Sequence, residues 1–447
     1  MNSLYLVVGF GKTGLSVARY LHRNNKTFVG FDTRLESPGL NEFKTSFPNV
    51  PVHLQTFPEE LLSQITDIIL SPGLSLDLPF LKKAREAGLS IYGDIECLAQ
   101  EISAPIVAIT GTNGKSTVTS LVGEMARAAG FKVAIAGNIG TCVLDMLADG
   151  THYDLWVLEL SSFQLELTHS LRPAVATILN ITPDHLDRHH SLEAYIEAKQ
   201  RIYNHCDTVI FNRDDEWTLP LNTPPKAPIS FGLSPASSSN WGLIKFENND
   251  ETYLAQGEDY FFPVSALLIK GVHNWLNALV ASALAHTVGV PRQAMVQVLK
   301  TFPGLAHRCQ WVRTLDGVDW MNDSKGTNVG ATISAINGIG SALTGKIVLI
   351  AGGQGKGANF SELTQVVSDF VRALVLIGED TNAIESALGS VVPTLRACSL
   401  EEAIAVARTK AQPADVVLLS PACASMDMFC DFNHRGEVFM AYVNGLQ

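Results

Sequence analysis

The chain has 447 residues, 46% of them hydrophobic, and a formal net charge of −12. At roughly 100–200 residues per domain, this length predicts two to four domains that each bury a core. The acidic balance disfavours broad binding to nucleic acids or anionic membranes, because both need basic stripes. The seven cysteines form no CxxC pair, which predicts reduced thiols in a cytosolic protein.

The N-terminal sequence MNSLYLVVGFGKTG lacks the basic segment of a signal peptide. No apolar run reaches the roughly 18 residues that a membrane-spanning helix needs. We therefore expect a cytoplasmic protein with neither nucleic-acid nor membrane partners.

Short apolar runs alternate with helical patterns along nearly the whole chain, which favours an α/β fold of parallel sheets covered by helices. Three stretches separate, and they predict domains over 1–95, 96–303 and 304–447. The predicted strands cover residues 5–10, 27–32, 66–73, 133–138, 154–162, 174–181, 208–212, 345–353, 373–380 and 415–423. The predicted helices include one from the GFGKTG turn to His22, one from Gly114 to Ala129, and two at 273–289 and 291–302. The Pro/Ser/Asn-rich stretch 213–252 predicts loops and short antiparallel strands.

The sequence AITGTNGKST at 108–117 places a glycine-rich turn between a strand and a helix. Such a turn directs backbone N–H groups at one point, and the helix N-terminus adds partial positive charge. We expect Lys115 to reach terminal phosphates and Ser116 to hold Mg²⁺. The motif is a shortened phosphate loop, because Ile109 stands where GxxxxGK[ST] has glycine. An ordinary glycine turn before a helix is the alternative.

The sequence GFGKTG at 9–14 follows the first strand, and Asp32 ends the second. This placement predicts a pyrophosphate at the helix N-terminus and a ribose near Asp32. It does not distinguish NAD from another nucleotide diphosphate, and a structural tight turn remains the alternative.

Two further strands end in polar residues. Glu159 ends one strand, and Asp184 with His185 follows another, so a carboxylate and an imidazole on neighbouring strand ends could hold a second Mg²⁺. Surface charge and helix capping by Asp184 are the alternative. A zinc site through His185 and His189 is disfavoured because no cysteine or second histidine pair completes a tetrahedral set. We expect His189 and His190 to be solvated.

Several polar residues later in the chain could contact ligands. Asn274 and Asn277 share one helical face and could bind a base or phosphate, or cap the helix. Arg308, Asp323 and Lys325 fit a nucleotide lying between domains, or a structural salt bridge. In the last unit, an anionic substrate could contact Lys356, Ser425 and Phe432, although Lys356 could equally be a plain exposed lysine. By its own surroundings in the sequence, Lys199 is a surface lysine.

The order of these motifs resembles the Mur ligases over essentially the full length. It consists of AITGTNGKST, ELSSFQLE, ITPDHLDRH, EAKQRIY, HNWLNA, LAHR, NDSKGTN and SPACAS. In the first domain, GFGKTGLS, FDTR and SPGL favour the member that adds D-glutamate to UDP-N-acetylmuramoyl-L-alanine. The Asp-Asn-Pro-Arg motif, typical of the sister ligase that adds a diamino acid, is absent from the sequence. Gln354 and Asn359 depart from the family pattern GGDGKGADF, in which both are aspartates.

The resemblance implies a Rossmann-like UDP domain, a central P-loop ATPase domain and a Rossmann-like amino-acid domain, in a monomeric enzyme of bacterial cell-wall synthesis in the cytoplasm. It implies that UDP contacts Gly11, Thr13, Gly14, Thr33, Arg34, Ser71 and Gly73. It implies that ATP contacts Gly111, Thr112, Asn113, Gly114, Lys115, Ser116, Thr117, Asn274, Asn277, Arg308 and Asp323. Asn138 and His185 would contact the muramoyl-peptide side, and D-glutamate would contact Thr327, Lys356, Ser425 and Phe432. Lys325 is also expected to contact a substrate.

The resemblance also implies the catalytic and metal-binding residues. Lys115, Glu159, His185 and Lys199 would be catalytic. Ser116, Glu159 and His185 would position two Mg²⁺ ions, with Lys199 as a carbamylated lysine that supports the second ion. The implied reaction forms an acyl phosphate and then a tetrahedral intermediate, and releases ADP and phosphate. The alternatives are a folylpolyglutamate-synthetase-like ligase, an NAD-dependent oxidoreductase and a nucleotide-gated binding protein without ligase activity.

Overall fold

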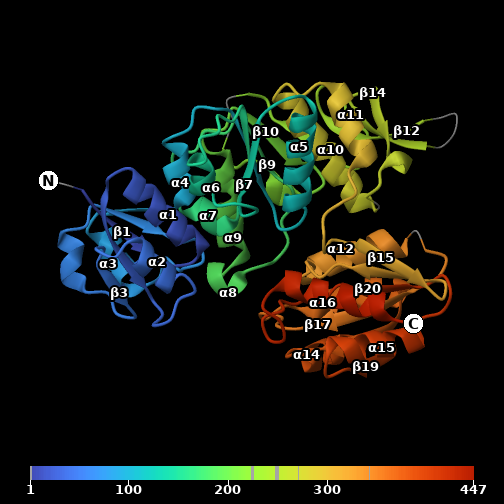
Figure 1. Cartoon of the computed structure of the whole chain (residues 1–447). Coiled ribbons are helices and arrows are strands. Elements are labelled where there is room, and N and C mark those ends of the chain that lie inside the picture. Colours follow the sequence, from blue (N-terminus) through green and yellow to red (C-terminus); the bar gives the residue numbers. More distant parts are fainter. Residues whose placement is uncertain (1–2, 223–225, 247–250, 270, 342) are drawn as a thin grey trace.

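The computed structural model describes residues 3–222, 226–246, 251–269, 271–341 and 343–447, which form three sheets flanked by helices (Figure 1). The sheets are mostly parallel, and each belongs to its own domain, which confirms the predicted α/β class with three domains. The exact divisions after residues 95 and 303 stay a proposal, and the first of them falls inside a helix, Asp94–Ala99. Among the described residues, no helix combines the length and apolar character needed to cross a bilayer.

The N-terminal sheet is parallel throughout, with the order β3-β2-β1-β4-β5. The chain leaves β1 toward β2 on one side and later returns to β4 on the other, so a crevice opens at the carboxyl end of β1. The strands are β1 Leu4–Val8, β2 Thr27–Asp32, β3 Val52–Leu54, β4 Asp67–Leu70 and β5 Ser90–Tyr92. The helices are α1 Lys12–Arg23, α2 Leu40–Ser46, η1 Glu59–Ser63, α3 Pro79–Glu86 and α4 Asp94–Ala99.

The central sheet has the order β14-β13-β12-β11-β10-β9-β6-β8-β7. Its buried strand β6 lies between β8 and β9, which again places a switch point at a strand's carboxyl end. The strands are β6 Ile106–Thr110, β7 Val133–Gly137, β8 Leu155–Glu159, β9 Val175–Ile178, β10 Thr208–Asn212, β11 Ile229–Phe231, β12 Trp241–Phe246, β13 Glu251–Gln256 and β14 Asp259–Pro263. The helices are α5 Lys115–Ala128, α6 Val143–Leu147, α7 Ser162–Glu166, α8 Leu186–His189, α9 Leu192–Gln200, η2 Arg201–Tyr203, η3 Glu216–Thr218, η4 Val264–Ala266, α10 Val272–Thr287 and α11 Arg292–Thr301.

The stretch 213–252 matches its prediction in part. β12 pairs antiparallel with β13, as expected for short antiparallel strands, whereas β11 continues the parallel sheet beside β10. Residues 223–225 and 247–250 of this stretch lie outside the described residues.

The C-terminal sheet has the order β15-β16-β20-β17-β18-β19, in which β15 pairs antiparallel with β16 and the other pairs are parallel. The β15–β16 hairpin was not predicted from the sequence. The strands are β15 Gln310–Leu315, β16 Val318–Asn322, β17 Ile347–Gly352, β18 Val371–Ile377, β19 Thr394–Arg396 and β20 Val416–Leu419. The helices are α12 Val329–Gly340, η5 Phe360–Leu363, α13 Thr364–Phe370, α14 Thr381–Leu388, α15 Leu400–Lys410 and α16 Phe432–Gly445.

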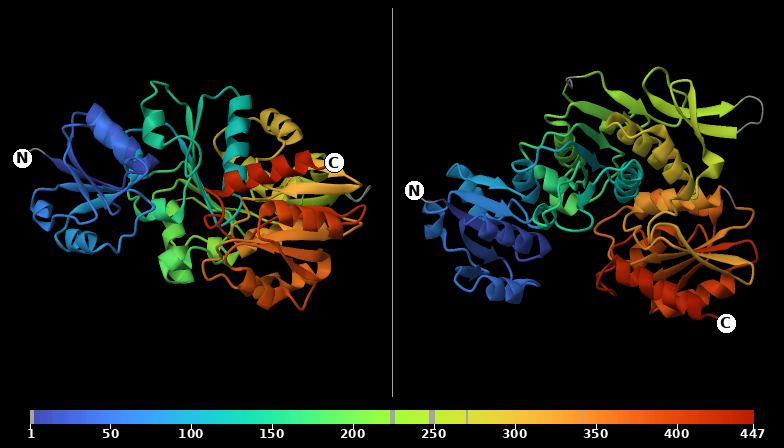
Figure 2. Two further views of the ribbon diagram at one scale, coloured as in Figure 1. Left: turned by 60° about the horizontal axis from the view of Figure 1, so that its bottom comes forward. Right: turned by 45° about the horizontal axis from the view of Figure 1, so that its top comes forward.

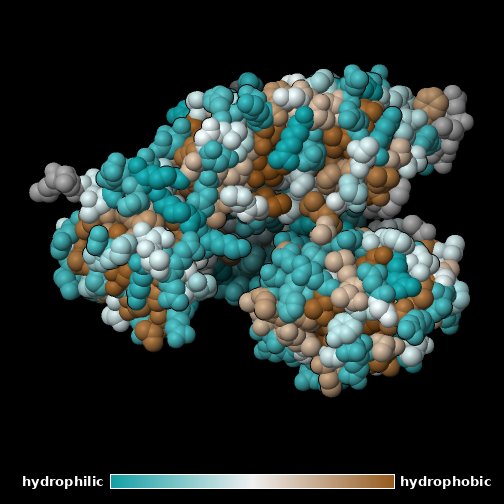
Figure 3. Space-filling view, in the orientation of Figure 1, coloured by the Kyte–Doolittle hydropathy of each residue, from teal (hydrophilic) through white to brown (hydrophobic). Residues whose placement is uncertain are grey.

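The central domain forms one interface, or seam, with the N-terminal domain and another with the C-terminal domain, and different kinds of side chain form the two seams. One buried apolar cluster runs from Val7 and Phe10 of the N-terminal domain to Trp156 and Leu158 of the central sheet. Arg19 of α1 adds an ion pair to Asp145 of α6, with 2.6 Å between Nη2 and Oδ2. The C-terminal domain has core clusters of its own. Figure 2 shows it as a separate body beside the central domain, and Figure 3 shows the face of the molecule hollowed where the domains meet.

Candidate active site

The turn after β6 is held against the segment that follows β9. The backbone N–H of Thr112 donates to the carbonyl of Asn180 at 2.9 Å, and the Asn113 N–H donates to the Asn180 side chain at 2.9 Å. The Thr182 N–H donates to the Thr112 hydroxyl at 3.0 Å. Because both segments follow neighbouring strands, the sheet itself brings them together, and the glycine-rich turn is fixed at the N-terminus of α5.

Two lysine amines converge on one carbonyl in this turn. The Nζ of Lys115 donates to the carbonyl oxygens of Gly111 and Thr112, both at 2.8 Å, and the Nζ of Lys199 donates to the same Gly111 oxygen at 2.9 Å. Lys199 lies on α9 with 1% of its surface exposed, 4.6 Å from the centroid of the Tyr195 ring. The expectation of a surface lysine from the local sequence was therefore wrong, because α9 packs against the phosphate loop.

Burial lowers the pKa of both amines. At Lys115 the carboxylates of Glu159 and Asp184 oppose this lowering of the pKa. Burial, followed by repulsion from Lys115, holds the pKa of Lys199 well below its usual value. The buried Lys199 amine is thereby favoured in its neutral, nucleophilic form.

Glu159 ends β8 with 2% of its surface exposed. Its Oε1 accepts a hydrogen bond from the Asn138 side chain at 2.9 Å, and its Oε2 is buried without a partner in the structure. A buried carboxylate oxygen with no donor is costly. This atom is therefore available to a cation or a ligand proton.

His185 and His189 lie at the two ends of α8, which in Figure 1 points toward the space between the N-terminal and C-terminal domains. His185 is 5.0 Å from Phe163 between ring centroids, and burial lowers its pKa. His189 is 4% exposed, stacks on Phe163 and lies 2.9 Å from the Ser162 hydroxyl through Nε2. The expectation that His189 is solvated was wrong, because α8 turns back onto α7, whereas the side chain of His190 is exposed.

A cavity of about 290 Å³ separates the central and C-terminal domains. Central-domain residues face the segment that follows β16 and the helix α12 across it. Its lining includes Asn113, Gly114, Thr117, Asn274, Asn277, Arg308, Asp323 and Lys325, all of them predicted ligand contacts. The Asn277 amide donates to the Asn274 side chain at 3.1 Å, so the two asparagines share a helical face as predicted.

Arg308 reaches across the seam to the phosphate loop, because its Nη2 donates to the Ser116 hydroxyl at 2.9 Å. Asp323 accepts from the Ser420 hydroxyl at 2.7 Å and from the Cys309 N–H at 3.1 Å. Burial raises the pKa of Asp323 to about 6. The arginine therefore meets the phosphate loop, while the carboxyl is held inside the C-terminal domain.

Of the residues predicted to bind an amino acid, the structure brings Lys325 and Phe432 into contact. The Nζ of Lys325 lies 3.8 Å from the centroid of the Phe432 ring, and burial lowers its pKa to about 8. Ser425 is buried, Thr327 is half-buried, and Lys356 is exposed on a loop, with its charge lowering the pKa of His185.

A second cavity, of about 330 Å³, lies at the carboxyl end of β1. Its lining includes the predicted Gly11, Thr13, Thr33, Arg34, Ser71 and Gly73. Gly14 serves packing, because a Cβ atom there would lie 1.7 Å from the Gly9 carbonyl oxygen.

The expectation of a ribose at Asp32 finds little support in its contacts. Asp32 is fully buried, and its Oδ2 accepts from the Phe10 N–H at 2.8 Å and from Arg34 Nη2 at 3.0 Å. Its Oδ1 accepts from the Arg34 N–H and Nε. Both carboxylate oxygens are therefore used to shape the loop after β2.

Sequence reasoning missed several residues that build this site. Asn180 and Thr182 clamp the phosphate loop, Tyr195 packs on Lys199, and Asn328 donates to Asp184 across the seam at 3.0 Å. The signal for Asn180 was its place directly after a strand, next to residues that were noticed. Nothing in the local sequence marks Tyr195 or Asn328.

Three family models match the chain. One described as Mur ligase MurD-like, N-terminal domain matches residues 3–93, one described as Mur ligase middle domain matches 109–285, and one described as Mur ligase, glutamate ligase domain matches 307–423. These regions carry the cavity at β1, the phosphate loop and the seam with the C-terminal sheet.

Proteins named UDP-N-acetylmuramoylalanine–D-glutamate ligase are similar along the whole chain. One from Legionella pneumophila strain Paris is 68% identical and covers 100% of both chains. One from Pseudomonas aeruginosa is 48% identical and covers 99% of this chain and 98% of its own.

Solved structures share the fold at low identity. A pseudomurein peptide ligase type C from Methanothermus fervidus aligns with TM-score 0.64 and 17% identity over 100% of both chains. A MurF ligase from Thermotoga maritima in complex with ADP aligns with TM-score 0.62 and 17% identity, covering 99% of this chain and 95% of that one. The three matched regions and the full-length relatives lead to one conclusion: the chain belongs to the Mur ligase family.

Proposed function

We propose that the protein is an ATP-dependent ligase that joins the amine of D-glutamate to the carboxylate of UDP-N-acetylmuramoyl-L-alanine. The names of relatives 68% and 48% identical over the full chain support this assignment. The observation that carries it is the meeting of Lys115, Lys199 and Arg308 at the phosphate loop, beside the orphaned carboxylate oxygen of Glu159. Lys115 of the central domain and Arg308 of the C-terminal domain bring positive charge to the point where two anionic substrates have to meet.

The reaction requires a carboxylate to be activated, because it is a poor electrophile at neutral pH. Transfer of the γ-phosphoryl group of ATP to the muramoyl-alanine carboxylate gives an acyl phosphate. The D-glutamate amine attacks its carbonyl, and the tetrahedral intermediate collapses to the amide and phosphate. On binding ATP, Lys115 would exchange the two loop carbonyls for phosphate oxygens, while Arg308 would approach the phosphates from the other side of the seam.

The residues present fit Mg²⁺. Glu159 offers a buried, unpartnered oxygen, Ser116 offers a hydroxyl, and burial keeps the His185 imidazole toward its neutral, ligating form. When bound, Mg²⁺ neutralises phosphate charge. The described residues hold no group of three His, Cys, Asp or Glu side chains suited to a metal, so phosphate oxygens would complete the coordination.

Lys199 fits the carbamylation that the family resemblance implies. A protonated amine is neither a metal ligand nor a nucleophile, but burial favours the neutral form of Lys199. Addition of CO₂ to Nζ, with loss of a proton, would place an anion beside Lys115, where it would form a charge pair with the Lys115 ammonium.

The amino-acid side of the reaction is assigned to the C-terminal domain. Lys356, Ser425, Thr327 and Phe432 would hold D-glutamate, with Lys325 beside the Phe432 ring. The UDP part would occupy the cavity at β1 that Thr33, Arg34 and Ser71 line. Asn138, hydrogen-bonded to Glu159, would contact the muramoyl-peptide portion.

The alternatives explain less. An NAD-dependent oxidoreductase needs Asp32 for a ribose, but both oxygens of Asp32 bond to the protein. A folylpolyglutamate-synthetase-like ligase shares the phosphate loop but has that loop near its N-terminus, whereas a complete parallel sheet precedes it here. A cytoplasmic, monomeric enzyme remains our expectation.

The test is phosphate release from ATP with UDP-N-acetylmuramoyl-L-alanine, with and without D-glutamate, combined with mass spectrometry of the product. We expect release to depend on both substrates and the product mass to increase by one glutamate residue. A panel including L-glutamate and diamino acids tests the choice of amine. Release that is equally fast without any amino acid would instead assign the protein to nucleotide-gated binding proteins.

A further inference from the structure

Asn328 uses the two ends of its side-chain amide for different domains. Its Oδ1 accepts a hydrogen bond from the Ala331 N–H at 2.8 Å and so caps α12 of the C-terminal domain. Its Nδ2 donates to Oδ2 of Asp184 in the central domain at 3.0 Å. The other oxygen of Asp184 accepts from the His185 N–H at 2.9 Å. One hydrogen bond therefore joins the start of α12 to Asp184, and a second, within the loop, ties Asp184 to the backbone of His185.

The neighbours of this connection belong to the proposed site. Thr327 precedes Asn328, and His185 follows Asp184. Within the first turn of α12, a Cβ atom on Gly330 would lie 3.0 Å from the Thr182 hydroxyl and 3.5 Å from the Asn113 amide. Gly330 and Ala331 also line the cavity at the seam. The N-terminal turn of α12 thus rests directly on the phosphate-loop side of that cavity.

Among the described residues, no cluster of buried apolar side chains spans this seam, although the partly buried Leu305 packs against the core of the central domain. The N-terminal and central domains share a buried apolar cluster, whereas the C-terminal domain meets the central domain through polar contacts, including Arg308 with Ser116. A hydrogen bond to a carboxylate, partly shielded from water, is stronger than an exposed one.

We propose that Asn328 is a positioning residue that latches the amino-acid domain onto the acyl-phosphate site and keeps water from reacting there. The proposal rests on the proposed function. Attack by the D-glutamate nitrogen forms a C–N bond, breaks the C–O bond to phosphate, and releases a proton and phosphate. Attack by water breaks the same bond and regenerates the carboxylate. The latch favours the first outcome by holding α12 against the loop of Asp184.

The hydrogen bond from Asn328 to Asp184, which is the latch, can be removed without removing the bond from the Ala331 N–H that caps α12. Serine caps a helix about as well as asparagine but is too short to keep the donor at Asp184. Asn328→Ser therefore removes the latch and keeps the cap. Asn328→Asp also keeps a capping oxygen but places a second carboxylate opposite Asp184.

The experiment measures the ratio of phosphate released to amide formed, using the full-length protein with ATP, UDP-N-acetylmuramoyl-L-alanine and D-glutamate. We expect a ratio near one for the native chain. For Asn328→Ser we expect about a tenfold rise in the fraction of acyl phosphate lost to water, the effect of losing one charge-assisted bond. The KM for D-glutamate should rise more than kcat falls. A ratio unchanged in Asn328→Ser overturns the proposal while the ligase assignment stands; no amide from the native chain would contradict the ligase assignment itself.

Two further variants exclude a general loss of stability. Ser399→Ala removes the N-cap of α15, where the Ser399 hydroxyl accepts from the Glu402 N–H at 3.1 Å. It should lower the free energy of unfolding and leave the ratio near one, and a ratio as high as that of Asn328→Ser would overturn the proposal. In Asp184→Asn/Asn328→Asp the donor and acceptor exchange places. We expect the ratio of phosphate released to amide formed to be closer to one in this double variant than in Asn328→Asp. Equal ratios in the two variants would assign the effect to charge alone and overturn the latch.

Discussion

At the scale of single residues, the site is built from charged groups placed where water is scarce. Lys115 and Lys199 share the Gly111 carbonyl, although each amine would repel the other if both were protonated. Two protonated amines at this distance are unfavourable without a ligand. Anions would stabilise positive charge there, whether as phosphate oxygens at Lys115 or as a carbamate on Lys199.

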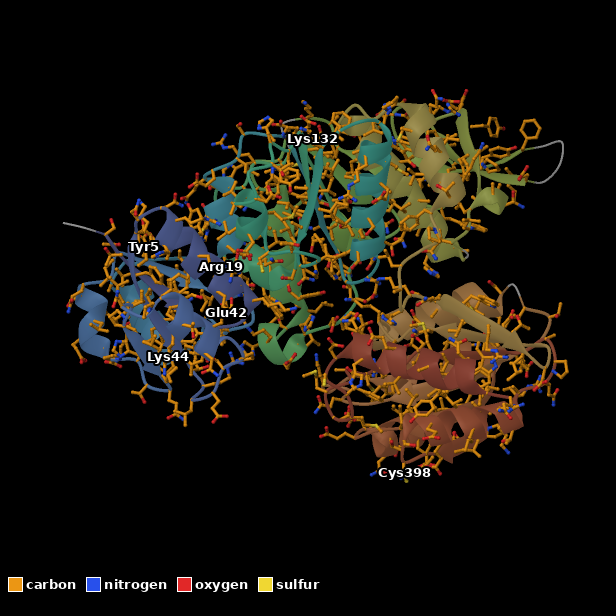
Figure 4. All side chains as sticks on the ribbon, viewed as in Figure 1. Tyr5, Arg19, Glu42, Lys44, Lys132 and Cys398 are labelled. Carbon is orange, nitrogen blue, oxygen red and sulfur yellow. The ribbon has the colours of Figure 1, made fainter. Side chains whose placement is uncertain are left out.

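Replacing Lys115 with alanine should abolish most amide synthesis, because no other described side chain occupies its place in the turn. We expect kcat to fall by at least about 100-fold. Lys132→Ala is the matched control, since Lys132 is exposed at the far end of the central domain (Figure 4). It should retain native activity. Undiminished amide synthesis in Lys115→Ala would contradict the assigned role of the phosphate loop.

Asp323 should make stability depend on pH. Burial raises its pKa from 3.8 to about 6, so the folded state binds this proton more tightly than the unfolded state. Stability from this group is present below pH 3.8 and is lost as pH rises through about 6, by a total of about 3 kcal/mol. An asparagine side chain does not ionise. The free energy of unfolding of Asp323→Asn, measured relative to that of the native chain, should therefore rise by about 3 kcal/mol between about pH 4 and pH 8.

Urea unfolding of the native chain and Asp323→Asn at several pH values measures this difference. Asp369→Asn, at an exposed position, is the control and should follow the native pH dependence. A constant difference between the native chain and Asp323→Asn across the range would show that the carboxyl is not held in a costly environment.

At the scale of elements, the turns place ligand-binding atoms and the helix caps fix the turns. Asn359 stands where the family pattern has aspartate, and its Oδ1 caps η5 by accepting from the Ser361 N–H at 3.2 Å. Gln354 donates to the Glu379 side chain at 3.0 Å while its backbone pairs with Ala424. Both departures from the expected motif therefore keep a local bonding role, and the loop of Lys356 is held without the two aspartates.

Gly114 should be more sensitive than another glycine of the same conformation. Gly114 and Gly130 begin and follow α5 with φ of +85° and +93°, but a Cβ atom on Gly114 would lie 2.6 Å from Asn277 Oδ1, whereas Gly130 has open space. Alanine should cost each about 1 kcal/mol in unfolding free energy through backbone strain. Only Gly114→Ala should also raise the KM for ATP, by about tenfold or more.

Urea unfolding and initial-rate kinetics on both variants separate these effects. Equal KM values for Gly114→Ala and Gly130→Ala would mean that the contact between the phosphate loop and α10 does not shape the nucleotide site.

At the scale of the whole molecule, the two seams predict where it moves. The N-terminal and central domains share an apolar cluster and the ion pair of Arg19, so they should move as one body. The C-terminal domain, in contrast, is separated from the central domain by a cavity of about 290 Å³. Polar contacts such as Arg308 with Ser116 join the two domains beside it. We expect an ATP analogue together with both other substrates to draw this domain inward and to lower the radius of gyration measured by X-ray scattering.

Spin labels can show which domain moves. Cys398 is an exposed cysteine of the C-terminal domain, and Lys132 and Lys44 are exposed on the other two domains (Figure 4). With Cys430 replaced by serine, the distance from Lys132→Cys to Cys398 should shorten on ligand binding. The distance from Lys132→Cys to Lys44→Cys, with Cys398 also replaced, should not change. A change confined to the second pair would contradict the assignment of the rigid seam.

The sequence by itself determined the α/β class, the order of the elements and most of the ligand-binding turns. These features are local: a strand, a glycine turn and a helix N-terminus lie within ten or so consecutive residues, so their pattern is legible in one stretch such as 108–117. The resemblance to Mur ligases added roles for residues like Lys199 that the local pattern treated as ordinary.

Only the tertiary structure decided which side chains meet. It buried Lys199 and His189, which the local sequence placed in solvent, and it turned Asp32 inward to Arg34 instead of toward a ribose. It also brought Asn328 to Asp184 and Arg308 to Ser116 across a seam. Burial and pairing between distant segments depend on how sheets and helices pack, and that information is spread over the whole chain, so no single stretch of residues contains it.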